Sequence, residues 1–232
     1  MTTMPVVLLE FDDVLAETRA PRLAALREAL AIEGVEFSDE TFDVSCAGLS
    51  FAAASRAAIR VSDVTGRNAD ETTIELAALR ASRAFGEAVA RGLPLGNGVM
   101  QFVQSAAGVA RLGIVTRAAR RDVDLILGFS GLDDSFECVV TAEDYTGPEP
   151  ASTPFDIAFS RMSEGRPVRV GGNIAIVASL NGVASARAAR FHPIVVGPVS
   201  PSLAFAGDGY LTSFDGMTVH DVLRIAAGAE AR

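Results

Sequence analysis

Short runs of consecutive apolar residues alternate along most of the chain with segments whose apolar positions recur every three or four residues. The apolar runs lie at 6–9, 112–115, 138–140, 174–177, 194–196 and 210–211. Runs of this length without polar alternation are typical of strands buried on both faces of a parallel sheet. The periodic segments predict helices, at 21–32, 100–107, 121–127, 155–162, 182–190 and 219–227. The pattern therefore predicts an α/β fold.

The stretch from 38 to 91 departs from this alternation. It holds Ala-rich helical segments, such as 51–59 and 72–89, and no strand-like run interrupts them. We expect a separate helical unit inserted into a parallel-sheet core whose two faces are covered by helices. Ligands of such sheets bind beyond the carboxyl ends of the strands. In this chain those ends carry acidic and hydroxyl residues, at 10–13, 116, 141–144 and 178–179.

Composition narrows the function classes. All 20 basic residues of the 232-residue chain are arginine, which excludes a Schiff-base lysine, a P-loop lysine and a lysine general base. The net charge of −9 argues against a nucleic-acid partner, because neutralising phosphates needs a basic surface. No apolar run reaches the roughly 20 residues that cross a bilayer, and the first residues lack the pattern of a signal peptide. We therefore expect a cytoplasmic protein with no membrane partner.

The two cysteines, Cys46 and Cys138, are far apart in the sequence, and neither has a CxxC partner. This spacing predicts two free, buried thiols in a reducing compartment. The two histidines, His192 and His220, are equally isolated, so the sequence predicts no histidine-based metal site.

Four segments carry recognisable motifs. Residues 8–18, LLEFDDVLAET, resemble an apolar strand followed by D-x-D-G-[TV]-L-x-[DE]-[ST], which is the first motif of the haloacid dehalogenase (HAD) superfamily. Residues 112–116 resemble the second motif, a strand that ends in Thr or Ser. Residues 139–155 are similar to the third motif, and residues 174–183 to the fourth, including the Asn-Gly before a helix. The motifs stand in the family's order, and the chain looks like the helical-cap subgroup of phosphoglycolate phosphatases and β-phosphoglucomutases.

The resemblance implies a HAD-like core with a Rossmann-like parallel sheet, formed by residues 1–17 and 92–232. It also implies an inserted α-helical cap formed by residues 18–91. Members of this subgroup are Mg²⁺-dependent phosphatases and phosphomutases, whose first-motif aspartate takes the phosphoryl group.

Site roles follow from the resemblance position by position. The catalytic positions are Glu10 (nucleophile), Asp12 (general acid/base), Thr116 (phosphoryl-oxygen binding) and Glu149 (the neutralising lysine of the family). Asp13, Thr116 and Arg117 fall on positions expected to bind substrate. Glu10 and Asp12 fall on positions expected to hold Mg²⁺. Asp13 occupies the position of the family's glycine.

Several of these positions depart from the family's chemistry. Glu10 replaces the nucleophilic Asp, Glu149 replaces Lys, and Val177 and Ala178 replace the two metal-binding acids. The extra methylene of Glu10 moves its carboxylate by about 1 Å, which can lower a rate roughly a hundredfold. Reversing a charge beside an anionic substrate acts on an interaction on the order of 4 kcal/mol at about 4 Å. Mg²⁺ prefers several oxygen ligands, so the loss of a carboxylate at 178 weakens its site.

Two hypotheses follow. In the first, the chain has lost phosphatase or phosphomutase catalysis, binds Mg²⁺ weakly or not at all, and serves a binding or regulatory role toward a small phosphorylated ligand or a protein partner. In the second, it is an active phosphohydrolase with a rearranged site, acting on a small phosphorylated metabolite. Arg117 then supplies the positive charge of the missing lysine. Arg117 could also lie on the surface, or pair with Glu149 or Glu10.

Overall fold

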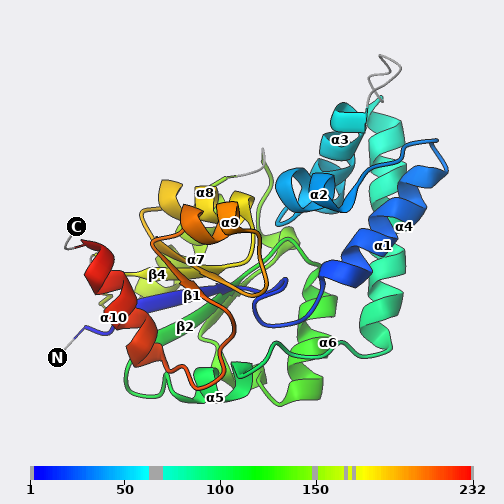
Figure 1. Cartoon of the computed structure of the whole chain (residues 1–232). Coiled ribbons are helices and arrows are strands. Elements are labelled where there is room, and N and C mark those ends of the chain that lie inside the picture. Colours follow the sequence, from blue (N-terminus) through cyan, green and yellow to red (C-terminus); the bar gives the residue numbers. More distant parts are fainter. Residues whose placement is uncertain (1–2, 63–69, 148–150, 165–166, 169–170, 231–232) are drawn as a thin grey trace.

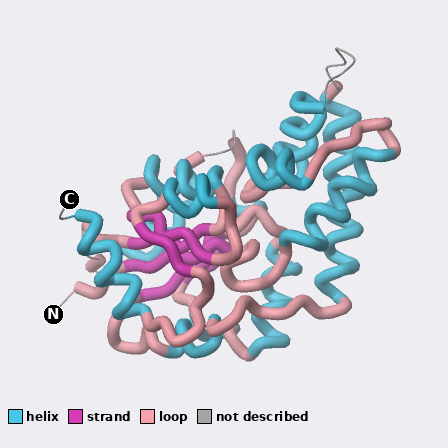
Figure 2. Tube along the Cα trace, viewed as in Figure 1, coloured by secondary structure: helices cyan, strands magenta, loops and turns pink. Residues whose placement is uncertain are grey.

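A computed structural model of the chain describes residues 3–62, 70–147, 151–164, 167–168 and 171–230. Within these residues, six strands form one parallel sheet in the order β3-β2-β1-β4-β5-β6 (Figures 1 and 2). The strands are β1 (Val6–Glu10), β2 (Arg111–Val115), β3 (Cys138–Val140), β4 (Ile174–Val177), β5 (His192–Val196) and β6 (Gly209–Leu211). This arrangement confirms the α/β class and the Rossmann-like parallel sheet.

Helices cover both faces of the sheet because the buried strands send alternate side chains to opposite faces. Val7 and Leu9 belong to one apolar cluster, and Val6 and Leu8 belong to the other. The first face packs against α5 (Val99–Gln104), α6 (Arg120–Ser130) and α10 (Val219–Glu230). The second packs against α7 (Thr153–Ser163), α8 (Leu180–Ala188) and α9 (Pro201–Ala206). In Figure 1 these two groups lie on opposite sides of the strands.

Between β1 and α5, the described residues hold helices and no strand. They are α1 (Arg19–Ala31), α2 (Asp39–Thr41), the π-helical turn η1 (Phe42–Cys46), α3 (Phe51–Ser62) and α4 (Glu71–Ala90). These helices stand together to one side of the sheet (Figure 1). Asp70 caps α4 by accepting a hydrogen bond from the Thr73 amide at 2.8 Å. The division into a core of 1–17 and 92–232 and a cap of 18–91 stays a prediction.

One apolar cluster runs without a break from the sheet into the inserted helices. It contains Leu9 of β1 together with Leu26 of α1 and Phe85 of α4. Because the helices share this core with the sheet, their position over the strand ends is set by packing. The remaining short helices are the 3₁₀ turns η2 (Asp133–Ser135) and η3 (Ala142–Asp144).

Some details of the sequence predictions can be compared directly with the structure. Cys46 and Cys138 are both free and buried, as expected. The helix predicted at 100–107 ends earlier, at Gln104, and the chain continues in turns to Gly108, which has a φ of 72°. In the described part of the chain, no helix has both the length and the apolar character needed to span a bilayer.

Candidate active site

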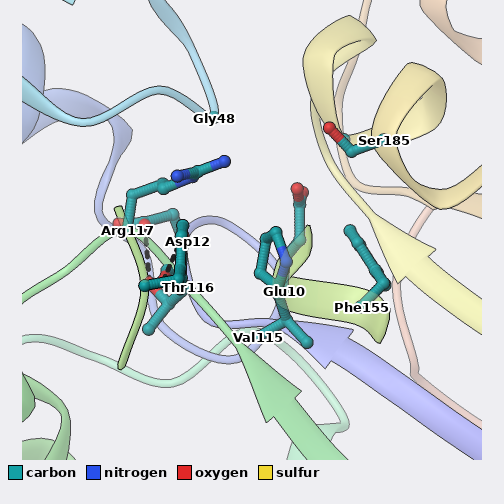
Figure 3. Close-up of a pocket in the computed structure, with 11 residues that line it drawn as sticks. Glu10, Asp12, Gly48, Val115, Thr116, Arg117, Phe155 and Ser185 are labelled. Carbon is teal, nitrogen blue, oxygen red and sulfur yellow. Dashed lines mark hydrogen bonds between the residues drawn. The ribbon is translucent and has the colours of Figure 1, made fainter. Parts of the chain in front are cut away.

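The predicted site residues that lie in the described part of the chain gather at the carboxyl end of the sheet. Parallel pairing sets Glu10 beside Val115 at the ends of β1 and β2, and Leu9 beside Ile176 of β4. A cavity opens there, and Figure 3 shows its lining side chains. The lining residues are Glu10, Asp12, Gly48, Val115, Thr116, Arg117, Tyr145, Pro154, Phe155, Gly182 and Ser185. The cavity leaves about 20 Å³ for the centres of water molecules, which is room for one or two waters.

Glu10 projects from the end of β1 toward the start of α8 (Figure 3). Its Oε2 accepts a hydrogen bond from the Ala178 amide at 3.0 Å. Gly182 is required opposite the carboxyl, because a Cβ at that position would overlap the Glu10 carboxyl group. Burial raises the pKa of Glu10 to about 8, against the lowering effect of the Ala178 amide, and the nearby charges of Asp12 and Asp13 raise it further. Glu10 is therefore mostly protonated and neutral at pH 7.

Asp12 is enclosed by one hydroxyl and one guanidinium. Its Oδ2 accepts a hydrogen bond from Thr116 Oγ1 at 3.2 Å, and Arg22 Nη1 lies 3.6 Å from its Oδ1. Oδ1 is buried and has no hydrogen-bond partner among the described residues. Asp12 is thus held by a buried ion pair and retains one acceptor atom without a hydrogen-bond donor.

Arg22 is a site residue that sequence reasoning missed. It lies in α1 and is 5% exposed. Its Nη2 donates to the Leu49 carbonyl at 2.7 Å, and its guanidinium stacks on Phe51 at 4.5 Å. Helical spacing carried a signal, because position 22 lies four residues before Leu26, on the buried face of α1. An arginine on the buried, apolar face of a helix is expected to pair with an acidic residue, because a buried charge needs a partner.

Asp13 does not line the cavity described above. Its backbone is left-handed, with a φ of 59°, and its Oδ1 accepts from the amides of Thr18 at 2.9 Å and Arg19 at 2.6 Å. Asp is among the few non-glycine residues that tolerate this conformation. Burial, together with the charge of Asp12, raises the pKa of Asp13 to about 6. The structure thus uses Asp13 to hold the first turn of α1.

Replacing Asp13 with Ala should lower the free energy of unfolding by about 1–2 kcal/mol, since the first turn of α1 loses its acceptor and Ala is strained at positive φ. Asp13→Asn is the matched control, because Asn keeps an acceptor and tolerates the same φ, and it should lose less than half as much. Urea unfolding followed by circular dichroism measures both. Equal losses in the two variants would contradict the capping role.

Thr116 and Arg117 follow β2 directly. Besides donating to Asp12, Thr116 Oγ1 accepts from the Ala118 amide at 3.0 Å, so the hydroxyl both faces the site and stabilises the turn before α6. Arg117 lines the cavity, and its side chain extends beneath the loop that carries Gly48 (Figure 3). Its guanidinium stacks on the Tyr145 ring at 4.4 Å. Tyr145 lines the cavity as well, and the sequence did not single it out.

The remaining motif positions lie elsewhere. Glu149 falls outside the described residues. Val177 is fully buried in the apolar cluster beneath α8. Ala178 contributes its backbone amide to Glu10. Asp144, which also follows a strand, pairs with Arg161 at 2.7 Å. Burial would raise the pKa of Asp144, but hydrogen bonds from Thr141 and Arg161 outweigh it and hold that pKa at about 2.

These residues do not fit a Mg²⁺ ion. Oε2 of Glu10 already accepts a hydrogen bond from the Ala178 amide, Asp12 is paired with Arg22, and the positions of the fourth-motif acids carry Val177 and Ala178. Mg²⁺ requires several charged or polar oxygens in near-octahedral order. The described residues contain no group of three acids, histidines or cysteines that could hold a metal ion. No chemical step through a bound cation follows from this arrangement.

The fold and the motif residues at the ends of its strands identify the class of protein, and comparisons with known proteins give the same class. The model of the haloacid dehalogenase-like hydrolase family matches residues 7–190, and the chain belongs to that family. Among curated proteins, none matches the chain.

Solved structures of similar fold span almost the whole chain. A β-phosphoglucomutase from Clostridium difficile superposes with a TM-score of 0.81 at 13% identity, covering 99% of this chain and 100% of its own. CbbY from Rhodobacter sphaeroides, solved in complex with phosphate, has a TM-score of 0.73 at 19% identity, covering 94% and 98%. A predicted phosphoglycolate phosphatase from Haemophilus somnus has a TM-score of 0.72 at 16% identity, covering 97% and 99%. At identities this low, the structural similarity shows the fold alone.

Proposed function

We propose that this chain is a haloacid dehalogenase-like hydrolase that has lost Mg²⁺-dependent phosphoryl transfer and binds a small ligand without converting it. The observation that carries the proposal is the state of Glu10. This residue stands at the position of the family's nucleophile, yet burial keeps it mostly protonated and the Ala178 amide occupies its Oε2. The second acid that would hold a metal beside it has become Ala178 itself.

The chemistry of a neutral carboxyl supports this. With its pKa raised to about 8 by burial, Glu10 is mostly protonated at pH 7, and the ionised form is the one that attacks phosphorus. Phosphoryl transfer also depends on cations that offset developing charge and on in-line placement of the nucleophile. The cavity above Glu10 has room for one or two water molecules, which is less room than a phosphoryl group and its ester need.

One observation favours the alternative of a rearranged phosphohydrolase. Arg117 lines the same cavity as Glu10, Asp12 and Thr116, so a guanidinium lies close to the motif positions. In that case, Asp12 or Glu10 would have to act with Arg117 in place of the metal and lysine. The small volume of the cavity and the protonated state of Glu10 argue against this arrangement.

A turnover assay separates the two. We expect no hydrolysis of aryl or sugar phosphates with Mg²⁺ present, so that the unaltered protein and its Glu10→Ala variant release phosphate at the same background rate. Release that disappears in Glu10→Ala, while the variant keeps its circular dichroism spectrum, would contradict the loss of catalysis and support the alternative.

Restoring the family residues tests whether the backbone of the site can still position ligands for a metal ion. The triple variant Glu10→Asp, Glu149→Lys and Ala178→Asp should bind Mg²⁺ measurably by titration calorimetry, because it adds a carboxylate at position 178 and restores the shorter aspartate at position 10. The matched control is the triple variant Glu10→Asn, Glu149→Lys and Ala178→Asn, which should bind no better than the unaltered chain. Equal binding by both triple variants would mean that the lost acids are not what prevents metal binding.

The proposal extends to the setting of the protein. A net charge of −9 disfavours nucleic acids as partners. We propose that the protein acts in the cytoplasm and binds a small ligand there, with a protein partner as the alternative.

A further inference from the structure

A second and larger pocket lies outside the cavity above Glu10. It has a volume of about 410 Å³, compared with about 20 Å³ for the inner cavity. Its walls come from η1, α3 and the loop between them, and from Gly147 and Asn181 of the sheet side. Pockets of this size accept small organic ligands. We call it the outer pocket, and its lining residues are Ser45, Leu49, Ser50, Ala52, Ala53, Arg56, Ala57, Arg60, Val61, Gly147 and Asn181.

The charge of the outer pocket runs against that of the whole chain. Acidic residues outnumber arginines 29 to 20 in the sequence, yet the described lining contains two arginines and no acid. Arg56 and Arg60 are four residues apart on α3, so both project from the same face of that helix. Arg56 is held by both carboxylate oxygens of Glu71, at 2.6 and 2.9 Å, and Glu71 is not part of the lining. Arg60 has no ion pair among the described residues. Glu71 therefore holds the guanidinium of Arg56 but not that of Arg60, and the Arg60 guanidinium can contact an anion in the pocket.

Apolar and polar groups divide the pocket. Leu49, Ala52, Ala53, Ala57 and Val61 give it an apolar wall along α3. Asn181 lines the pocket and donates from Nδ2 to the Ala47 carbonyl at 2.8 Å, a bond that does not use its Oδ1 acceptor. A ligand that fits therefore carries an anionic group for the arginines and an apolar body for the alanine-rich wall.

Contacts between the inserted helices and the sheet side separate the two cavities. Gly48 packs directly on Ser179, so closely that a Cβ at position 48 would overlap the serine side chain. The Asn181–Ala47 hydrogen bond lies beside this contact. A molecule seated in the outer pocket therefore does not reach Glu10 or Thr116. A ligand held there is away from the position of the family's nucleophile, so it would be bound without being hydrolysed.

We infer that the outer pocket binds a small organic anion, a phosphate or carboxylate on an apolar body, through Arg60 with Arg56 and Asn181. The inference rests on the proposed function, because it places the unconverted ligand at this pocket and outside the inner cavity. Bidentate guanidinium contacts serve phosphate and carboxylate alike, so the shared feature is a planar or tetrahedral oxyanion beside an apolar group.

Binding of three probes by titration calorimetry at low ionic strength tests this. We expect phenyl phosphate or phenylacetate, or both, to bind, and the uncharged analogue benzyl alcohol to bind at least tenfold more weakly. Arg60→Gln should weaken anion binding about tenfold or more, as expected for a lost charge-assisted hydrogen bond. Arg83→Gln is the matched control, since Arg83 is an exposed arginine of α4 that pairs with Glu87, and it should leave binding unchanged.

Two further arms make the outcomes distinct. Arg117→Gln alters the inner cavity, and binding should persist in that variant. If Arg117→Gln abolishes anion binding while Arg60→Gln does not, the ligand occupies the inner cavity and the inference is overturned, with the proposed function intact. If neither anion binds at millimolar concentration, the inference is likewise overturned. Phosphate released from phenyl phosphate and lost in Glu10→Ala would overturn the proposed function instead.

Discussion

Replacing Arg22 with Met should lower the free energy of unfolding by about 3–5 kcal/mol. The guanidinium is the buried partner of Asp12, and it also donates to the Leu49 carbonyl and stacks on Phe51 and Phe85. Met has a similar length and fills the space, but it leaves the Asp12 carboxylate buried with one hydroxyl donor. Most of the loss therefore comes from an uncompensated charge rather than from lost packing.

Urea unfolding measures this effect, followed by circular dichroism because the chain has no tryptophan. Arg27→Met is the matched control on the same helix, since Arg27 pairs with Asp39 on the surface and should contribute less than about 1 kcal/mol. In the double variant Arg22→Met with Asp12→Asn, the buried charge is gone and much of the stability should return. A double variant no more stable than Arg22→Met alone would show that the Asp12–Arg22 pair is not the source of the loss.

Glu10→Gln should make the protein more stable at pH 8 and have little effect at pH 4.5. The pKa of Glu10 is about 8 in the folded chain, against an ordinary value of 4.5. Between these pH values the folded state holds a proton that the unfolded state has released, so stability falls as pH rises through this window. The full effect at pH 8 is about 5 kcal/mol at most. Gln removes the titrating group and keeps an oxygen that can accept from the Ala178 amide.

The measurement is the free energy of unfolding at several pH values between 4.5 and 8, for the unaltered chain and the variant. Glu28→Gln is the control, because Glu28 is exposed on α1 and its replacement should leave the pH dependence unchanged. Asp13, whose pKa is raised to about 6, adds a similar fall between about pH 4 and 6 that remains in both proteins. Parallel curves for the unaltered chain and Glu10→Gln would show that Glu10 is ionised in the folded state.

The two expected outcomes, for Arg22→Met and Glu10→Gln, concern function as well as stability. The inner site holds three acids within a short stretch, and the folded chain manages them in three ways. Glu10 keeps its proton, Asp12 takes an internal cation from α1, and Asp13 receives backbone amides. Each of the three acids is thus neutralised or hydrogen-bonded by groups of the chain itself. This agrees with the poor fit of the residues to Mg²⁺.

Much of the fold was predictable from local pattern. Apolar runs such as 6–9 and 174–177 belong to strands that are buried on both faces, and burial on both faces leaves a mark in every residue of the strand. The capping residues Asp70 and Ser179 also stand where side-chain oxygens are expected to begin helices. The motif order along the chain placed Glu10, Asp12 and Thr116 at one edge of the sheet, because parallel strands end at the same edge.

The sequence by itself determined the family, the parallel sheet, and the substitutions at the motif positions, because each of these depends on residue identity and short-range spacing. Only the tertiary structure decided what those residues do. Burial set the protonation of Glu10, the packing of α1 against the site brought Arg22 to Asp12, and the fold placed Gly48 directly against Ser179. Desolvation and tertiary pairing depend on which groups surround an atom in space, and a linear sequence carries no direct record of that.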